Sequence, residues 1–187
     1  AVNAAVYGSV RRGRGRHVVT TGVEHSSVLE ALQREDLEVT VVGVDRHGRY
    51  DATEVGEAIR EDTALVTVQH ANHEVGTIQP AGEVAEACRE RGALVHLDAC
   101  MAVGHVSVDF GALGADLCSV SAHKFGGPKG AGALLVRRGL RLPPFVVGGA
   151  QERARRGGLE DVPAMVGFGA AAAEMASGDR LDTEGRA

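Results

Sequence analysis

One lysine stands where packing gives it no evident role. Lys124 lies between the short run 116–118 and the glycine-rich turn 126–130, with Ser121 and His123 just before it. No helix is expected there along which its apolar stem could lie. A desolvated lysine amine loses its proton readily and can hold an aldehyde as a Schiff base. The pattern therefore predicts an enzyme that binds an aldehyde cofactor, namely pyridoxal 5'-phosphate (PLP).

Such a cofactor needs a carboxylate near its ring, and Asp98 is the candidate. It ends the apolar strand expected at 93–97 and is followed by the small residues Ala99 and Cys100. An aspartate at this position can simply cap a helix. In the functional interpretation it keeps the pyridine nitrogen protonated, so that the ring can act as an electron sink. Both interpretations remain open on the sequence alone.

Two loop residues are further candidates. His25 follows the stretch 20–24. A loop histidine is commonly just solvated, but next to a cofactor it could stack on the ring and move protons. Asn72 lies in the polar stretch 70–80. Turns accept asparagine readily, while its amide could also bind a substrate carboxylate or the ring oxygen.

Two other kinds of site are not expected in these segments. The run 126–130 lacks the spacing of a nucleotide-binding loop and follows the lysine instead of opening a helix. His70, His73 and Glu74 suggest a metal pair, but no further ligands are placed nearby, so we predict no metal. Ser121 and His123 are instead expected to donate hydrogen bonds to the cofactor phosphate.

Alternating strands and helices must position these residues. Strands are expected at 17–20, 38–42, 64–68, 93–97, 117–120 and 133–136, and helices near 3–12, 26–35, 51–60, 80–91 and 161–177. Ser26 or Ser27 would open the second helix with Glu30 in capping-box position, and Asp51 would cap the third. This alternation predicts an α/β fold with a mostly parallel central sheet and helices on both faces. Ligands of such sheets bind outside the carboxyl ends of the strands, where the candidates fall.

Composition limits the class of protein. The net charge of −5 gives no reason to expect a nucleic-acid partner, and no apolar run is long enough to span a membrane. The three cysteines are widely spaced, which argues against a disulfide framework and for a reducing, cytoplasmic setting. The chain opens on Ala1 inside an uncapped helical pattern, so we expect a fragment of a larger protein.

Five segments, in this order, resemble the cysteine desulfurases of the NifS/IscS type, within the class V aminotransferase-like, fold-type I PLP enzymes. They are the stretches 20–25, 71–80, 96–99, 121–130 and 148–153. The resemblance runs over nearly the whole chain. It implies a PLP-binding large domain at 1–150, incomplete at both ends. It also implies a connector and helix at 151–187 that lead toward a small C-terminal domain outside this chain.

The resemblance implies a role for each matching position. Lys124 would form the Schiff base and mobilise the substrate α-proton, Asp98 would pair with the pyridine nitrogen, and His25 would stack on the ring as an acid/base. The other implied cofactor contacts are Asn72, near the ring oxygen and substrate carboxylate, and the phosphate ligands Ser121 and His123.

Three positions depart from the pattern. Met101 stands where the family typically has a glutamine that bonds the cofactor's phenolic oxygen, and a thioether donates no hydrogen bond. Leu159 replaces a threonine expected to reach the partner subunit's phosphate, and His73 replaces a second asparagine. These changes predict an altered hold on the cofactor.

The implied reaction takes sulfur from L-cysteine, leaving L-alanine and an enzyme persulfide. A homodimer and a sulfur-acceptor protein or scaffold, as in iron–sulfur assembly, are the implied partners. Cys100 is interpreted as a packing residue, so the nucleophilic cysteine is expected outside this chain and the chain alone is expected to be inactive. The alternatives are another class V PLP enzyme (aminotransferase, epimerase or selenocysteine lyase) or a catalytically inactive homologue.

Overall fold

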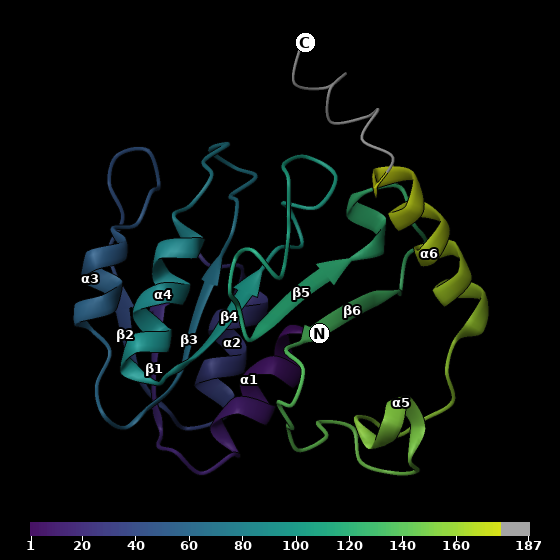
Figure 1. Cartoon of the computed structure of the whole chain (residues 1–187), viewed down its shortest axis with the longest axis horizontal. Helices are drawn as coiled ribbons and strands as arrows, with labels where there is room; N and C mark the ends of the chain where they lie inside the picture. Colours follow the sequence, from purple (N-terminus) through teal and green to yellow (C-terminus); the bar gives the residue numbers. More distant parts are fainter. Residues whose placement is uncertain (177–187) are drawn as a thin grey trace.

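The computed structural model describes residues 1–176 as a sheet with helices packed on it (Figure 1). The strands are β1 (His17–Thr21), β2 (Glu38–Val42), β3 (Thr63–Gln69), β4 (Leu94–Asp98), β5 (Leu117–Ser121) and β6 (Gly132–Val136). The helices are α1 (Val2–Val10), α2 (Ser26–Arg34), α3 (Ala52–Glu57), α4 (Ala81–Arg91), α5 (Gln151–Ala154) and α6 (Val162–Ala176), with a 3-10 turn at Ala122–Lys124.

The sheet confirms the predicted fold class. Its strand order is β2-β1-β3-β4-β5-β6. The first five strands are parallel, and β6 returns antiparallel to β5. The carboxyl ends of β1, β3, β4 and β5 therefore lie side by side along one edge, where Figure 1 shows the long loops.

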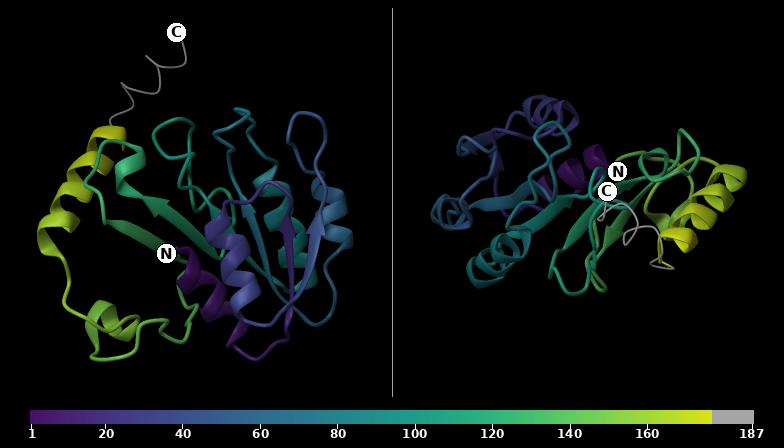
Figure 2. Two further views of the ribbon diagram at one scale, coloured as in Figure 1. Left: turned by 180° about the vertical axis from the view of Figure 1, so that it is seen from behind. Right: turned by 90° about the horizontal axis from the view of Figure 1, so that it is seen from above.

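Side chains that alternate along the central strands build two cores. Val18 and Leu65 pack with α1 and α2 on one face, whereas Val19 and Val66 pack with α3 and α4 on the other. The view from above in Figure 2 shows helices on both sides of the sheet. Because both faces are covered, β1 and β3 are buried along their whole length. That double burial explains the largely apolar sequence of β3.

Two buried histidines lie inside the sheet, and sequence patterns did not single them out. His17 bonds the hydroxyls of Thr63 at 2.7 Å and Thr40 at 2.8 Å. His96 bonds the hydroxyls of Thr67 and Ser119, each at 2.8 Å. Burial lowers the pKa of His96 to about 4, so its ring is neutral at physiological pH.

The helix caps confirm one prediction and correct another. Asp51 caps α3 through a 2.7 Å bond from the Thr53 amide, as predicted, although α3 ends at Glu57 and not near Arg60. The prediction that Ser26 or Ser27 opens α2 is wrong, because the N-cap is His25. The last predicted helix matches α6, while residues 177–187 lie outside the described part of the chain.

Candidate functional site

A cavity of about 800 Å³ opens at the carboxyl ends of β1, β3, β4 and β5. It is lined by the loops after the first three of these strands and by the turn after β5. The sheet brings all seven residues proposed from the sequence to this one cavity: His25, Asn72, Asp98, Met101, Ser121, His123 and Lys124. Their roles remain predictions, but their convergence follows from the parallel topology.

Asp98 is a buried carboxylate at the cavity that also bonds the turn after β4. It is the last residue of β4, is only 8% exposed, and accepts a 3.0 Å bond from the Cys100 amide at Oδ1. Residues 99–116 contain no helix, so the interpretation of Asp98 as a helix cap is wrong, and it instead bonds the turn after β4. A carboxylate held in this low-dielectric setting interacts strongly with a nearby cation.

His25 is exposed at the cavity, and its contacts fix which ring nitrogen carries the proton. Its Nδ1 accepts a 3.1 Å bond from the Ser27 amide and lies 2.9 Å from the Ser27 hydroxyl. An amide N–H can only donate, so Nδ1 carries no hydrogen in this arrangement. The neutral ring therefore has its proton on Nε2, which is left to act as a donor.

Lys124 ends the 3-10 turn that follows β5. Glycine shapes this turn, since a Cβ on Gly127 would lie 2.8 Å from the Ala122 Cβ. The Ser121 hydroxyl and His123 Nδ1 are 3.0 Å apart, so the two proposed phosphate ligands form a pair. Lys124 itself is exposed. The desolvation that we expected for its amine is therefore not provided by the described residues.

Asn72 uses its amide group to shape the loop after β3. Its Oδ1 accepts bonds from the amides of Glu74 at 2.8 Å and Val75 at 3.1 Å. Its Nδ2 donates to Gln69 Oε1 at 3.4 Å. The turn interpretation thus describes its contacts in this chain. The following residue, His73, is exposed and lines the cavity.

Met101 and Cys100 bring sulfur to the cavity wall, and both are half-buried. The Cys100 thiol lies 3.7 Å from the Ser119 carbonyl. Burial, together with the nearby Asp98 carboxylate, raises the pKa of this thiol well above its usual value. Because the thiolate is the nucleophilic form, Cys100 is unsuited to attack at neutral pH.

Sequence analysis missed Glu24, which lines the same cavity. Its side chain is buried, and Oε1 accepts from the Thr21 hydroxyl at 2.6 Å and from the Gln69 amide at 2.9 Å. Burial raises its pKa to about 8. A glutamate beside a histidine in a polar loop gives no sequence signal of burial, because the covering residues come from another strand.

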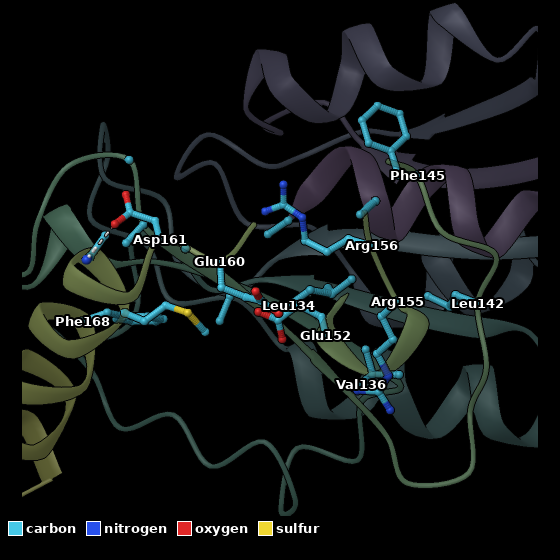
Figure 3. A pocket seen from close by; sticks show the side chains of 18 of the residues that line it. Leu134, Val136, Leu142, Phe145, Glu152, Arg155, Arg156, Glu160, Asp161 and Phe168 are labelled. Atoms are coloured by element: carbon cyan, nitrogen blue, oxygen red, sulfur yellow. Dashed lines mark hydrogen bonds between the residues drawn. The ribbon is translucent and has the colours of Figure 1, made fainter. Parts of the chain in front are cut away.

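A second cavity, of about 530 Å³, lies between β6, α5 and α6 and contains none of the predicted site residues (Figure 3). Its walls are largely apolar, and Figure 3 shows Glu152 and Glu160 among the side chains around the space.

In the described residues no cluster of three or more His, Cys, Asp or Glu is placed to hold a metal ion. Within residues 1–176, no helix has the length and apolar character of a membrane span.

Known proteins resemble the chain over nearly its full length. It is 47% identical over 175 residues to cysteine desulfurase IscS 1 of Archaeoglobus fulgidus, which covers 91% of this chain and 46% of that protein. It is 45% identical to cysteine desulfurase IscS of Methanosarcina thermophila, covering 86% of this chain and 40% of that protein. The chain thus spans about half the length of the curated relatives it matches.

Solved structures of other proteins also match this chain. A NifS-like protein superimposes with a TM-score of 0.88 at 36% identity, over 94% of this chain and 50% of that one. SspA in complex with cysteine superimposes with a TM-score of 0.86 at 35% identity, over 92% of this chain and 52% of that one. The family model of class-V aminotransferases matches residues 1–182. The chain therefore belongs to the aminotransferase class-V family.

Proposed function

We propose that this chain is the cofactor-binding part of a PLP-dependent cysteine desulfurase. The single observation that carries the proposal is the cavity that gathers Lys124, Asp98 and His25 at the carboxyl ends of adjacent parallel strands. The names of the relatives support the same chemistry. In the proposed reaction, L-cysteine and an enzyme thiol give L-alanine and an enzyme persulfide.

The donor set at the cavity fits PLP. It combines an amine on Lys124, a buried carboxylate on Asp98, and a hydroxyl–imidazole pair on Ser121 and His123. The volume of about 800 Å³ falls within the range of small-molecule sites. When bound, the cofactor supplies an electron sink that stabilises negative charge developing on the substrate.

Each side chain then has a distinct task. Lys124 would hold the cofactor and carry the substrate α-proton, since a lysine amine can serve as both nucleophile and base. Asp98 would favour a protonated ring nitrogen through its charge. His25 offers an Nε2 proton, because the Ser27 amide occupies its Nδ1. Ser121 and His123 would hold the phosphate.

The sulfur must be accepted by a thiol other than the three in this chain. Cys88 and Cys118 are buried, which raises the pKa of each to about 12, and Cys100 is held by Ser119 and Asp98. We therefore propose a nucleophilic cysteine outside this chain, a homodimeric enzyme and a protein acceptor for the sulfur. The 187-residue chain alone is expected to release no alanine from cysteine.

The decisive experiment reconstitutes the complete protein with PLP. Wild type should gain the visible absorbance of a lysine-bound cofactor and form alanine from cysteine, with sulfide released by a thiol reductant. Lys124→Ala should abolish both signals, whereas Lys129→Ala, in the same glycine-rich stretch, should keep them. Absence of visible absorbance in wild type with excess PLP would refute the proposal.

Met101 favours a second candidate function. A thioether in place of an amide changes the polarity at one wall of the cavity. The second candidate is another PLP enzyme of the same class, such as an aminotransferase, an epimerase or a selenocysteine lyase. Binding of PLP without alanine formation from cysteine would support this candidate over the desulfurase.

A further inference from the structure

Glu24 joins two strands where their backbone ladder ends. The β1–β3 register pairs Val18 with Leu65 and Val19 with Val66. Beyond that point side chains continue the connection. The Thr20 hydroxyl donates to the Thr67 carbonyl at 3.0 Å. Glu24 Oε1 then accepts from the Gln69 amide at 2.9 Å. The loop after β1 thus stays attached to β3 beyond the last paired residues.

Gln69 extends this connection to the candidate site. Its Nε2 donates to the Val23 carbonyl at 2.7 Å, and its Oε1 accepts from Asn72 Nδ2 at 3.4 Å. Glu24 also accepts from the Thr21 hydroxyl at 2.6 Å. The Glu24 carboxyl group therefore ties Thr21, just before the loop that presents His25, to Gln69 at the end of β3, and the Gln69 side chain extends the connection to Asn72.

The surroundings of Glu24 favour its uncharged form. Its Oε2 is buried, and in the described structure it has no hydrogen-bond partner. Burial and the Asp98 carboxylate both raise its pKa, which reaches about 8. The titratable groups that act on it or share the cavity are Asp98 on β4, Cys100 after β4, Tyr50 before α3, His25 at α2, His73 and Glu74 after β3, and His123 and Lys124 after β5. A buried carboxylate oxygen without a partner is far less favourable than a neutral carboxyl group.

We propose that Glu24 is a positioning residue of the cofactor cavity that holds the His25 loop against the end of β3 as a neutral carboxylic acid. The inference rests on the proposed function, because it treats this cavity as the PLP site. Ionisation of Glu24 would place a buried negative charge beside Asp98 and loosen the loop. The cavity should therefore lose cofactor affinity as the solution becomes alkaline.

The test measures the PLP dissociation constant of the complete protein from its visible absorbance between pH 6.5 and 9.5. Wild type should bind progressively more weakly above about pH 8, where Glu24 ionises. Glu24→Gln keeps a neutral acceptor and should remove that alkaline loss, with affinity at pH 7 within about threefold of wild type. Glu24→Ala leaves the Gln69 amide without its partner and should weaken binding about tenfold or more at every pH.

Two further variants make the result specific. Glu30→Gln alters an exposed glutamate on α2 and should retain the wild-type pH dependence in full. Thr21→Val removes one of the two bonds to Glu24 and should weaken binding a few-fold, which keeps the test decisive if Glu24→Ala does not fold. An alkaline loss in Glu24→Gln equal to that of wild type would overturn the proposal. Wild-type affinity in Glu24→Ala would do the same.

Failure of the proposed function gives a different result. If wild type binds no PLP at any pH, the PLP assignment fails, and Glu24 is judged on the cofactor-free protein. The melting temperature of wild type should then fall from about pH 5 to pH 8 relative to Glu24→Gln, because the folded state retains a proton that the unfolded state releases. Parallel melting curves for the two proteins would show that Glu24 is not neutral in the fold.

Discussion

Several polar side chains that line the cavity also bond the backbone beside them. Asn72 and Asp98 each accept from a nearby amide, and His25 caps α2. These contacts hold each side chain in one orientation before any ligand binds. Preorganisation of this kind lowers the entropy that binding must otherwise lose. Groups that look structural in sequence can therefore also serve the site.

Met101 offers a direct test of the proposal that the cavity holds PLP. Met101→Gln replaces a weak acceptor by an amide with both a donor and an acceptor. One added hydrogen bond of about 0.5–1.5 kcal/mol should tighten PLP binding about 2- to 13-fold. Met101→Leu keeps the apolar volume and should leave the affinity near that of wild type. A dissociation constant that is unchanged or larger in Met101→Gln would show that Met101 does not face the bound ring.

Cysteine reactivity should follow the burial of the three thiols. The pKa of Cys100 is raised by burial and by Asp98, so its nucleophilic thiolate forms only in alkaline solution. Alkylation of the folded protein at pH 8 should modify Cys100 about tenfold or more slowly than free cysteine, and the rate should still rise above pH 9. Cys88 and Cys118 should react only after unfolding, as mass spectrometry of the labelled peptides can check. Fast labelling of Cys100 that levels off below pH 9 would restore it as a candidate nucleophile.

Residue type and position near the end of a strand predicted several of the residues that line the cavity. Lys124 and Asp98 follow apolar strands, and parallel topology brings such positions together. Glu24 and His96 could not be predicted in this way. Their burial and partners depend on how β1, β3, β4 and β5 align, which a single sequence does not specify.

Strands and helices were predicted more completely, since hydrophobic periodicity is a local signal. The expected strand at 38–42 matches β2, and the expected helix at 26–35 differs from α2 by one residue. Caps were less predictable, because a side chain competes with its neighbours for the same amide. His25 accepts from the Ser27 amide, which leaves the serines inside the helix.

Asp116 ties three strands together and should be important for stability. Its Oδ2 accepts from the Val95 amide at 3.0 Å, and its Oδ1 accepts from Arg137 Nε at 2.6 Å. Asp116→Ala leaves a buried amide without a partner and should lower the free energy of unfolding by about 1–3 kcal/mol. Arg137→Ala removes only a solvent-exposed partner and should lower it by less than about 1 kcal/mol. Equal losses of unfolding free energy for the two variants in urea denaturation would show that stability depends on the ion pair with Arg137 and not on the bond to the Val95 amide.

The apolar residues of the central strands are better covered than those of α6. The central strands are buried between helices, whereas in α6 only Ala171 is buried. Leu159, just before α6, and Val162, Met165 and Val166 on its first turns are exposed apolar residues, here called the α6 patch, and Leu159 is 89% exposed. The chain spans about half of the solved structures that it matches. The uncovered α6 patch is therefore consistent with a proposed subunit or domain contact.

This patch leads to a prediction for the 187-residue chain in solution. Exposed apolar side chains grouped on one helix favour association, because contact removes their surface from water. The chain should bind a hydrophobic dye and elute from size exclusion above its monomer mass. Leu159→Lys with Val166→Lys should reduce both effects, since two like charges would face each other across a contact.

The matched control, Val39→Lys with Val41→Lys on the edge strand β2, should leave association through α6 intact. A monomeric wild-type chain that binds no dye would exclude the α6 patch as a contact surface. Loss of association only in the variant with Val39→Lys and Val41→Lys would show that the contact lies at β2, the opposite edge of the sheet.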